Sequence, residues 1–169
     1  MTTAAIDPVT QKMIDFVQSI GIPVRLGVIA HKTFVPGIDI EYGKLAIDLD
    51  KLKYPGDILH EAGHIAVAPP DIRKTLNGNL DKDEDFQMSG ELMAIPWSYA
   101  ACIHLNIDPA VVFHNNGYQG GGDNIIENFS KGQYFGVPML QWIGLTYEPH
   151  KAAENGGEPF PKMKKWMRE

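Results

Sequence analysis

Two histidines and a glutamate are the residues of this chain best placed to do chemistry. His60, Glu61 and His64 form the pattern H-E-x-x-H within YPGDILHEAGHIAV, residues 54–67. On an α-helix, residues four positions apart project from the same face, so both imidazoles could bind one metal ion. Glu61 shares that direction less easily, but it could take a proton from a water that the ion activates. This arrangement is typical of zinc metallopeptidases.

The surroundings of the motif favour this interpretation over two alternatives, a pair of surface histidines and a metal site without catalysis. Pro55 can begin a helix, and four apolar residues of the segment can anchor it in a core: Ile58, Leu59, Ile65 and Val67. Gly63 costs a helix about 1 kcal/mol relative to alanine. We therefore expect another part of the chain, such as a second helix, to approach closely there.

A catalytic zinc needs a third protein ligand and one open position. The metzincin pattern would need glycine, and then histidine or aspartate, where Val67 and Pro70 stand, so the third ligand is expected to be a glutamate on a second helix. Glu91 and Glu84 are the candidates. Glu91 opens the apolar segment 89–105, where a lone carboxylate is costly unless it is paired or bound to a metal. Glu84 lies in a charge cluster, so we rank it second.

Other polar residues could support the site from further away. Ser98 lies two turns beyond Glu91, and Asp71 could orient a ligand histidine. Hydrolysis also needs a hydrogen-bond donor that stabilises the developing oxyanion. The candidates for this donor are Tyr99, His104, His114 and Tyr118.

The pattern of apolar residues predicts an α+β fold in one domain, residues 1–169. We expect a helix over 7–20, a strand over 22–30, a β-hairpin with its turn at Tyr42-Gly43, the motif helix from Pro55 to Ala68, a surface loop over 71–87, a helix over 89–105, and further helices from Asp108, near 123–131 and near 137–144. Residues 148–169 could form a loosely packed tail.

The composition of the chain argues against several classes of function. Net charge is −6, which disfavours direct binding to nucleic acid. The single cysteine, Cys102, cannot form an internal disulfide, the N-terminal residues do not resemble a signal peptide, and no apolar run approaches the roughly 20 residues that span a bilayer. We therefore expect a cytoplasmic protein that does not bind membranes.

Two segments, GIDIEYGKLAIDLDKLKYPGDILHEAGHIAV and ELMAIPWSYAA, resemble the ImmA/IrrE metallopeptidase family, and the likeness covers about residues 20–105. The resemblance implies a zincin-like fold, in which a small sheet with a hairpin packs on the motif helix and a second helix supplies a glutamate. It implies that His60, His64 and Glu91 bind zinc and that Glu61 is the general base. Family members often pair with helix-turn-helix repressors, which some of them cleave or antagonise, so a transcriptional regulator is one expected substrate.

The expected function is therefore zinc-dependent hydrolysis of a peptide or protein. The alternative is a catalytically silent zincin-fold module that binds a partner protein and keeps a metal for stability. The sequence leaves the substrate and the oligomeric state open.

Overall fold

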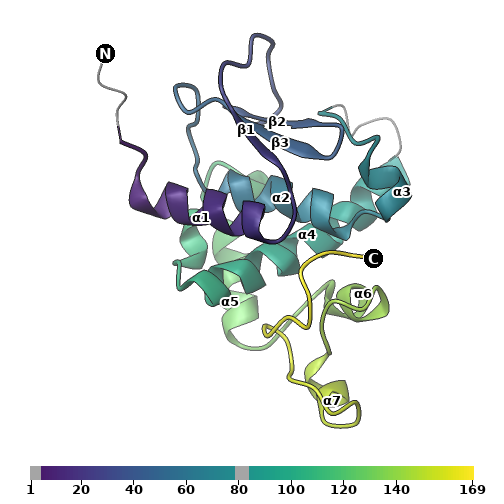
Figure 1. The fold of residues 1–169 in the computed structure, drawn as a ribbon. Helices are drawn as coiled ribbons and strands as arrows, with labels where there is room; N and C mark the ends of the chain where they lie inside the picture. The colour runs from purple at the N-terminus through teal and green to yellow at the C-terminus, as the bar shows by residue number, and fades with distance from the viewer. Residues whose placement is uncertain (1–4, 79–83) are drawn as a thin grey trace.

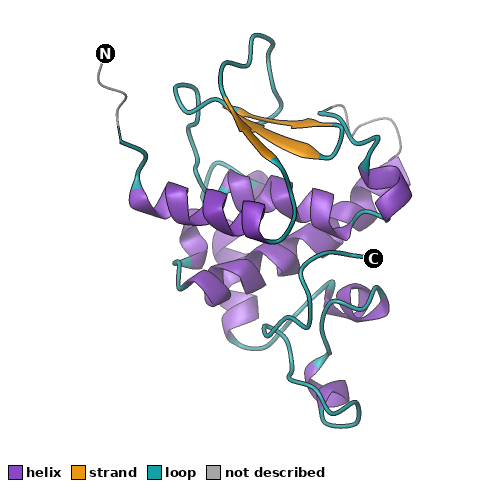
Figure 2. Ribbon diagram, in the orientation of Figure 1, coloured by secondary structure: helices purple, strands orange, loops and turns teal. Residues whose placement is uncertain are grey.

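The computed structural model of the protein describes residues 5–78 and 84–169 and has an α+β fold, as predicted. Figure 1 and Figure 2 show a small sheet that lies on one side of a group of helices. The elements in chain order are α1 (Pro8–Ser19), β1 (Val24–Leu26), β2 (Ile38–Glu41), β3 (Lys44–Ile47), α2 (Asp57–Val67), α3 (Pro70–Arg73), α4 (Glu84–Leu105), the 3₁₀ helices η2 (Pro109–Val111) and η3 (Tyr118–Gly120), α5 (Gly122–Ser130), α6 (Val137–Trp142) and α7 (Pro149–Ala152).

The sheet is mixed and has the strand order β1-β3-β2. β2 and β3 form the predicted hairpin, in which Ile38 pairs with Ile47 and Glu41 with Lys44. Tyr42 and Gly43 have φ values of 52° and 77°, as the two-residue turn of such a hairpin requires. β1 pairs with β3 in parallel and is shorter than the predicted strand over 22–30. The central position of β3 leaves β2 at one edge of the sheet.

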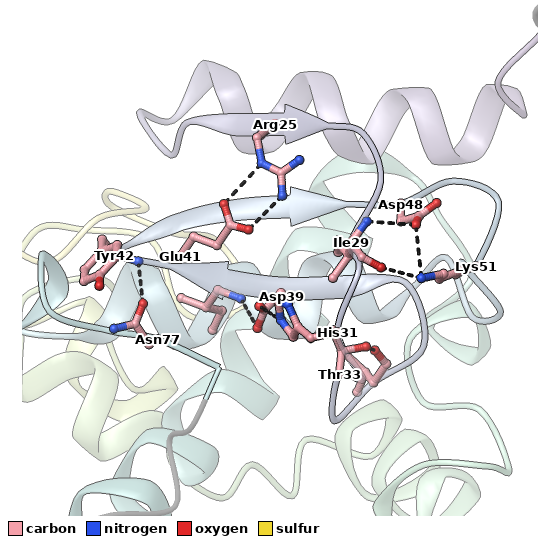
Figure 3. A network of polar contacts seen from close by, with 12 residues as sticks. Arg25, Ile29, His31, Thr33, Asp39, Glu41, Tyr42, Asp48, Lys51 and Asn77 are labelled. Carbon is pink, nitrogen blue, oxygen red and sulfur yellow. Dashed lines mark hydrogen bonds and ion pairs between the residues drawn. The ribbon is translucent and has the colours of Figure 1, made fainter.

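The long connection from β1 to β2 is tied to the sheet by polar contacts (Figure 3). The carboxylate of Asp48 accepts a hydrogen bond from the backbone N–H of Ile29 at 3.0 Å, and the Lys51 ammonium group donates to the backbone carbonyl of Ile29. Further along, His31 Nε2 lies 2.7 Å from Asp39 Oδ2 on β2. These contacts hold the residues that follow, including Phe34, beside the edge strand.

α2 and α4 pack against each other at small residues. A Cβ atom on Gly63 would lie 3.1 Å from Trp97 Cε3 and 3.3 Å from Ala94 Cα, so the glycine permits the close approach expected there. α4 begins at Glu84, five residues before the predicted start, because the sequence EDFQM is composed largely of residues that favour helices. The predicted loop over 71–87 also contains most of α3, which Pro70 begins.

The last 22 residues, for which a loose tail was one expectation, pack on the helices. Phe160 is buried. The Trp166 ring lies 4.9 Å from the Phe16 ring and 5.5 Å from the Trp97 ring, measured between centroids. Trp97 Nε1 donates to the backbone carbonyl of Trp166 at 3.0 Å. The C-terminal segment thereby contributes to the same hydrophobic core as α1 and α4.

None of the helices in the described ranges 5–78 and 84–169 is long and apolar enough to cross a membrane.

The packing of the C-terminal segment gives a stability prediction. Trp166→Ala should lower the free energy of unfolding by roughly 2–4 kcal/mol, because the side chain fills a space between two other aromatic rings. Trp142→Ala is the matched control, since that ring is 82% exposed, and should change stability by less than about 0.5 kcal/mol. Urea denaturation followed by circular dichroism would measure both, and equal effects would contradict the packed arrangement.

Candidate metal centre

α2 presents the motif histidines on one face. Its other faces are fixed in the core by side chains that are fully buried: Ile58, Leu59, Ala62, Ile65 and Ala66. The two imidazoles project from the remaining face, and His60 Nε2 lies 3.3 Å from His64 Nε2. Both side chains are largely buried, with 13% and 10% of their surface exposed. The one-turn spacing therefore brings the two ring nitrogens together, as predicted.

α4 brings Glu91 to the same point. Its Oε2 atom lies 3.0 Å from His64 Nε2 and 3.3 Å from His60 Nε2. The packing of the helix pair allows this approach. Ala94, one turn further along α4, packs at Gly63, and Gly90 lies beside the His64 ring, where a Cβ would be in ordinary van der Waals contact with Nδ1 at 3.4 Å. The small residues at the contact between α2 and α4 therefore allow the Glu91 carboxylate to reach His60 and His64.

The three atoms fit the requirements of a divalent metal ion. Their mutual distances are 3.0, 3.3 and 3.3 Å. Ligands at 2.0–2.1 Å from a tetrahedral zinc are about 3.3–3.4 Å apart, a separation close to these distances. The ligand atoms of His60, Glu61 and His64 also lie within 4.8 Å of one another, so this group could hold a metal ion.

Electrostatics favour a charged carboxylate at this point. Burial raises the pKa of Glu91, but hydrogen bonds from His60 and His64 outweigh burial and lower that pKa below its usual value. For His60, burial lowers the pKa, whereas the carboxylate of Glu91 raises it, and the net shift is upward. The anionic carboxylate therefore attracts positive charge, which either protons on the imidazoles or a metal ion can supply.

A second set of polar contacts lies beside the three atoms. Tyr118 Oη lies 2.9 Å from His60 Nδ1, the ring nitrogen that faces away from Glu91. One turn earlier on α2, Asp57 Oδ1 lies 2.8 Å from His114 Nε2, whose ring stacks on Tyr54 with centroids 4.3 Å apart. From the sequence, Tyr118 and His114 were only two of several candidate donors, and Asp57 was not among the candidates. The three-residue spacing from Asp57 to His60 was the available signal, since it places both on one helix face.

The other predicted site residues make no hydrogen bond to His60, His64 or Glu91 in the described part of the chain. Ser98 is buried and donates to the Ala94 carbonyl at 2.6 Å. Tyr99 packs in an aromatic cluster, 5.0 Å from Phe129 between ring centroids. Asp71 is exposed on α3. α4 begins at Glu84, but its side chain lies outside the described residues, so its candidacy as third ligand stays a prediction.

A cavity of about 90 Å³ opens beside the histidines. One side of it is polar, formed by His60, Glu61, His64 and Glu91, and the other side is largely apolar. The residues of that second side are Phe34, Val35, Ile38, Asp39, Ile40 and Gly78. Glu91 is 43% exposed, so the carboxylate and the two histidines can be reached from the cavity. The arrangement could therefore bring a small part of a ligand to a bound ion and to the carboxylate of Glu61.

Comparison with protein-family models, curated proteins and solved structures gives no match to this chain. The resemblance to ImmA/IrrE metallopeptidases accordingly stays a prediction that rests on the quoted residues.

The geometry predicts how metal binding depends on each side chain. Wild-type protein should retain close to one zinc ion per chain after dialysis, whereas His60→Ala, His64→Ala and Glu91→Ala should bind zinc at least tenfold more weakly, because each removes one of three converging ligands. Metal analysis by mass spectrometry and zinc titration would measure this. Glu84→Ala is the matched control, and a loss of zinc in that variant but not in Glu91→Ala would overturn the assignment.

Proposed function

We propose that the protein is a zinc-dependent peptidase with a zincin-like arrangement of α2 and α4. The observation that supports this most directly is the convergence of His60 Nε2, His64 Nε2 and Glu91 Oε2, with Glu61 beside them in a cavity. Two imidazoles and one carboxylate are the ligand set of many catalytic zinc sites, in which the fourth position stays open. Bound there, zinc would polarise a peptide carbonyl and lower the pKa of water to about 7.

Glu61 is the general base in this proposal. It lies next to His60 on α2, lines the cavity, and is not held in an ion pair among the described residues. As the oxygen of a water attacks the carbonyl carbon, the Glu61 carboxylate takes one proton from that water. The same carboxyl group then gives the proton to the amine nitrogen as the C–N bond breaks, so it ends the cycle as a carboxylate.

The edge strand β2 is suited to hold an extended peptide beside these residues. Asp48 N donates to Gly37 O at 2.8 Å, so the backbone groups of alternate β2 residues are paired with β3. By this alternation the backbone groups of Ile38 and Ile40 face the free edge. The N–H of Ile38 donates to the Val35 carbonyl at 3.4 Å, and the N–H of Ile40 donates to the neighbouring Asp39 carboxylate at 3.0 Å.

This edge leaves a short length of backbone for a substrate. Isolated bridges close both of its ends, Val35 to Ile38 and Glu41 to Asn77. Between them, the N–H of Ile40 could exchange the Asp39 carboxylate for a carbonyl of the substrate, in the manner of strand addition. β3 offers no such edge, because it is paired on both sides.

The apolar side of the cavity indicates which substrates fit. Phe34 and Val35 line it, and Phe34 is 95% exposed although polar contacts hold its loop to the sheet. A cavity of about 90 Å³ equals the volume of about three water molecules, which suits one aliphatic side chain. We therefore propose substrates that carry such a side chain next to the bond that is cleaved. A transcriptional regulator is the protein substrate that the sequence resemblance suggests.

The role of Glu61 can be tested by removing its charge. Glu61→Gln should retain zinc and fold stability but lose at least 10²–10⁴-fold in kcat, because the amide cannot take the proton from water. The measurement is cleavage of an unstructured protein such as casein and of a peptide library, read by mass spectrometry. Glu154→Gln, at an exposed position, is the control and should be fully active.

Two results would contradict this role. Undiminished cleavage by Glu61→Gln would exclude Glu61 as the base. Absence of cleavage by zinc-loaded wild type on every peptide would favour the alternative of a protein-binding module with a structural metal.

The role of Phe34 can be tested on the same library. Phe34→Ala should reduce kcat/KM about tenfold for peptides with a large aliphatic side chain next to the cleaved bond, since loss of the contact costs roughly 1.4 kcal/mol. Peptides with glycine there should be affected little. Val28→Ala is the matched control, because Val28 is an exposed apolar residue of the same loop that does not line the cavity. An equal loss for all peptides would contradict a role in specificity.

A further inference from the structure

The loop from Val112 to Gly122 contacts α2 through two side chains that the hydrolytic mechanism does not use. His114 contacts Asp57 at 2.8 Å, and Tyr118 contacts His60 at 2.9 Å. Their partners are three residues apart on α2 and therefore lie on the same face of the helix. The loop is thus attached beside the three converging ligand atoms, and one attachment is made directly to a proposed metal ligand.

Tyr118 is held firmly in this position. Its ring packs on Phe113, with centroids 5.2 Å apart, and meets the His60 ring edge-on at 5.3 Å and 87°. The residue has a φ of 55°, in the left-handed region that costs a side-chain-bearing residue about 1–2 kcal/mol. The ring contacts and the hydrogen bond can offset that cost. Only the hydroxyl group contacts a nitrogen of His60, whereas the ring contacts would be kept by phenylalanine.

The hydroxyl contact has a specific consequence for a metal-binding imidazole. A neutral imidazole that binds a metal through Nε2 must carry its proton on Nδ1. In His60 that N–H would donate to Tyr118 Oη at 2.9 Å. Such a contact fixes both the tautomer and the orientation of the ring, and loss of a contact of this kind typically weakens metal binding by about 10–100-fold.

We propose that Tyr118 is a positioning residue for His60, and that it couples metal binding at His60, His64 and Glu91 to docking of the loop 112–122 on α2. This inference rests on the metal site of the proposed function but not on peptide hydrolysis. Coupling between two events is reciprocal, so a bound metal stabilises the docked loop as much as the docked loop strengthens metal binding. The segment 106–169, which carries no recognised motif, thereby takes part in the metal centre.

The test uses the full chain with zinc as the only ligand. Tyr118→Phe should bind zinc about 10–100-fold more weakly in competition with a chelator, while its thermal denaturation without metal stays close to that of wild type. Tyr134→Phe is the matched control, because Tyr134 packs on Phe129 and Phe160 and does not contact the histidines. Its zinc affinity should match that of wild type.

Two further measurements separate a positioning role from a structural one. In zinc-loaded wild type, nitrogen NMR should find the His60 proton on Nδ1 and in slow exchange with water, and the exchange should be fast in Tyr118→Phe. Hydrogen–deuterium exchange of the loop 112–122 should slow when zinc binds to wild type, and it should change much less in the variant. The NMR result needs no variant, so it tests the proposal even if Tyr118→Phe is unstable.

The outcomes are distinguishable from those of the proposed function. Wild type that binds no zinc would overturn the metal site and this inference together. Wild type that binds zinc but cleaves no peptide would overturn the hydrolysis and leave the coupling standing. Equal zinc affinity in wild type and Tyr118→Phe would overturn the coupling alone, whereas a His60 proton on Nε2 in the loaded protein would overturn both the coupling and the binding of zinc through that nitrogen.

Discussion

The close approach of α2 and α4 at Gly63 is the constraint on which the rest of the site depends. Ala94 and Trp97 fill the space that a side chain at Gly63 would need. Because the two helices lie this close together, the carboxylate of Glu91 on α4 reaches the imidazoles of His60 and His64 on α2. The cost of a helical glycine, about 1 kcal/mol, is therefore offset by packing and by a favourable electrostatic arrangement.

The sheet contributes the opposite side of the same cavity. Ile38 and Ile40 pack their side chains against the helices, and the same two residues direct their backbone groups to the free edge of β2. Side chains alternate between the two faces of a strand, and backbone groups alternate between its two edges, so the same alternate residues can serve both purposes. The loop that carries Phe34 is attached to β2 and to the residues after β3 by hydrogen bonds to carboxylates, so this wall of the cavity is anchored to the sheet (Figure 3).

Local patterns predicted much of the fold and part of the site. The hairpin, the first helix and the H-E-x-x-H face of α2 follow from neighbouring residues, and the structure has all three. Glu91 could be named because a carboxylate in an apolar segment needs a partner, although it lies well inside α4 and does not open it. Tyr118 could not be chosen over its alternatives, because 58 residues separate it from His60 and no periodic pattern connects them.

The C-terminal end of α2 explains why residues without a motif of their own still matter for the centre. Arg73 donates to the Ile65 and Ala68 carbonyls at 3.0 Å each, and the backbone N–H of Arg168 donates to the Ala66 carbonyl at 2.9 Å. These N–H groups donate to carbonyls that the end of a helix leaves unpaired. The positive charge of Arg73 also interacts favourably with the negative, C-terminal end of the helix dipole. A site that depends on separations of about 3 Å needs a helix that cannot slide or fray, because small displacements weaken ligand convergence. α2 is held by α3 and the C-terminal segment at its end and by α4 along its side, and this support keeps the side-chain atoms of His60, His64 and Glu91 close together.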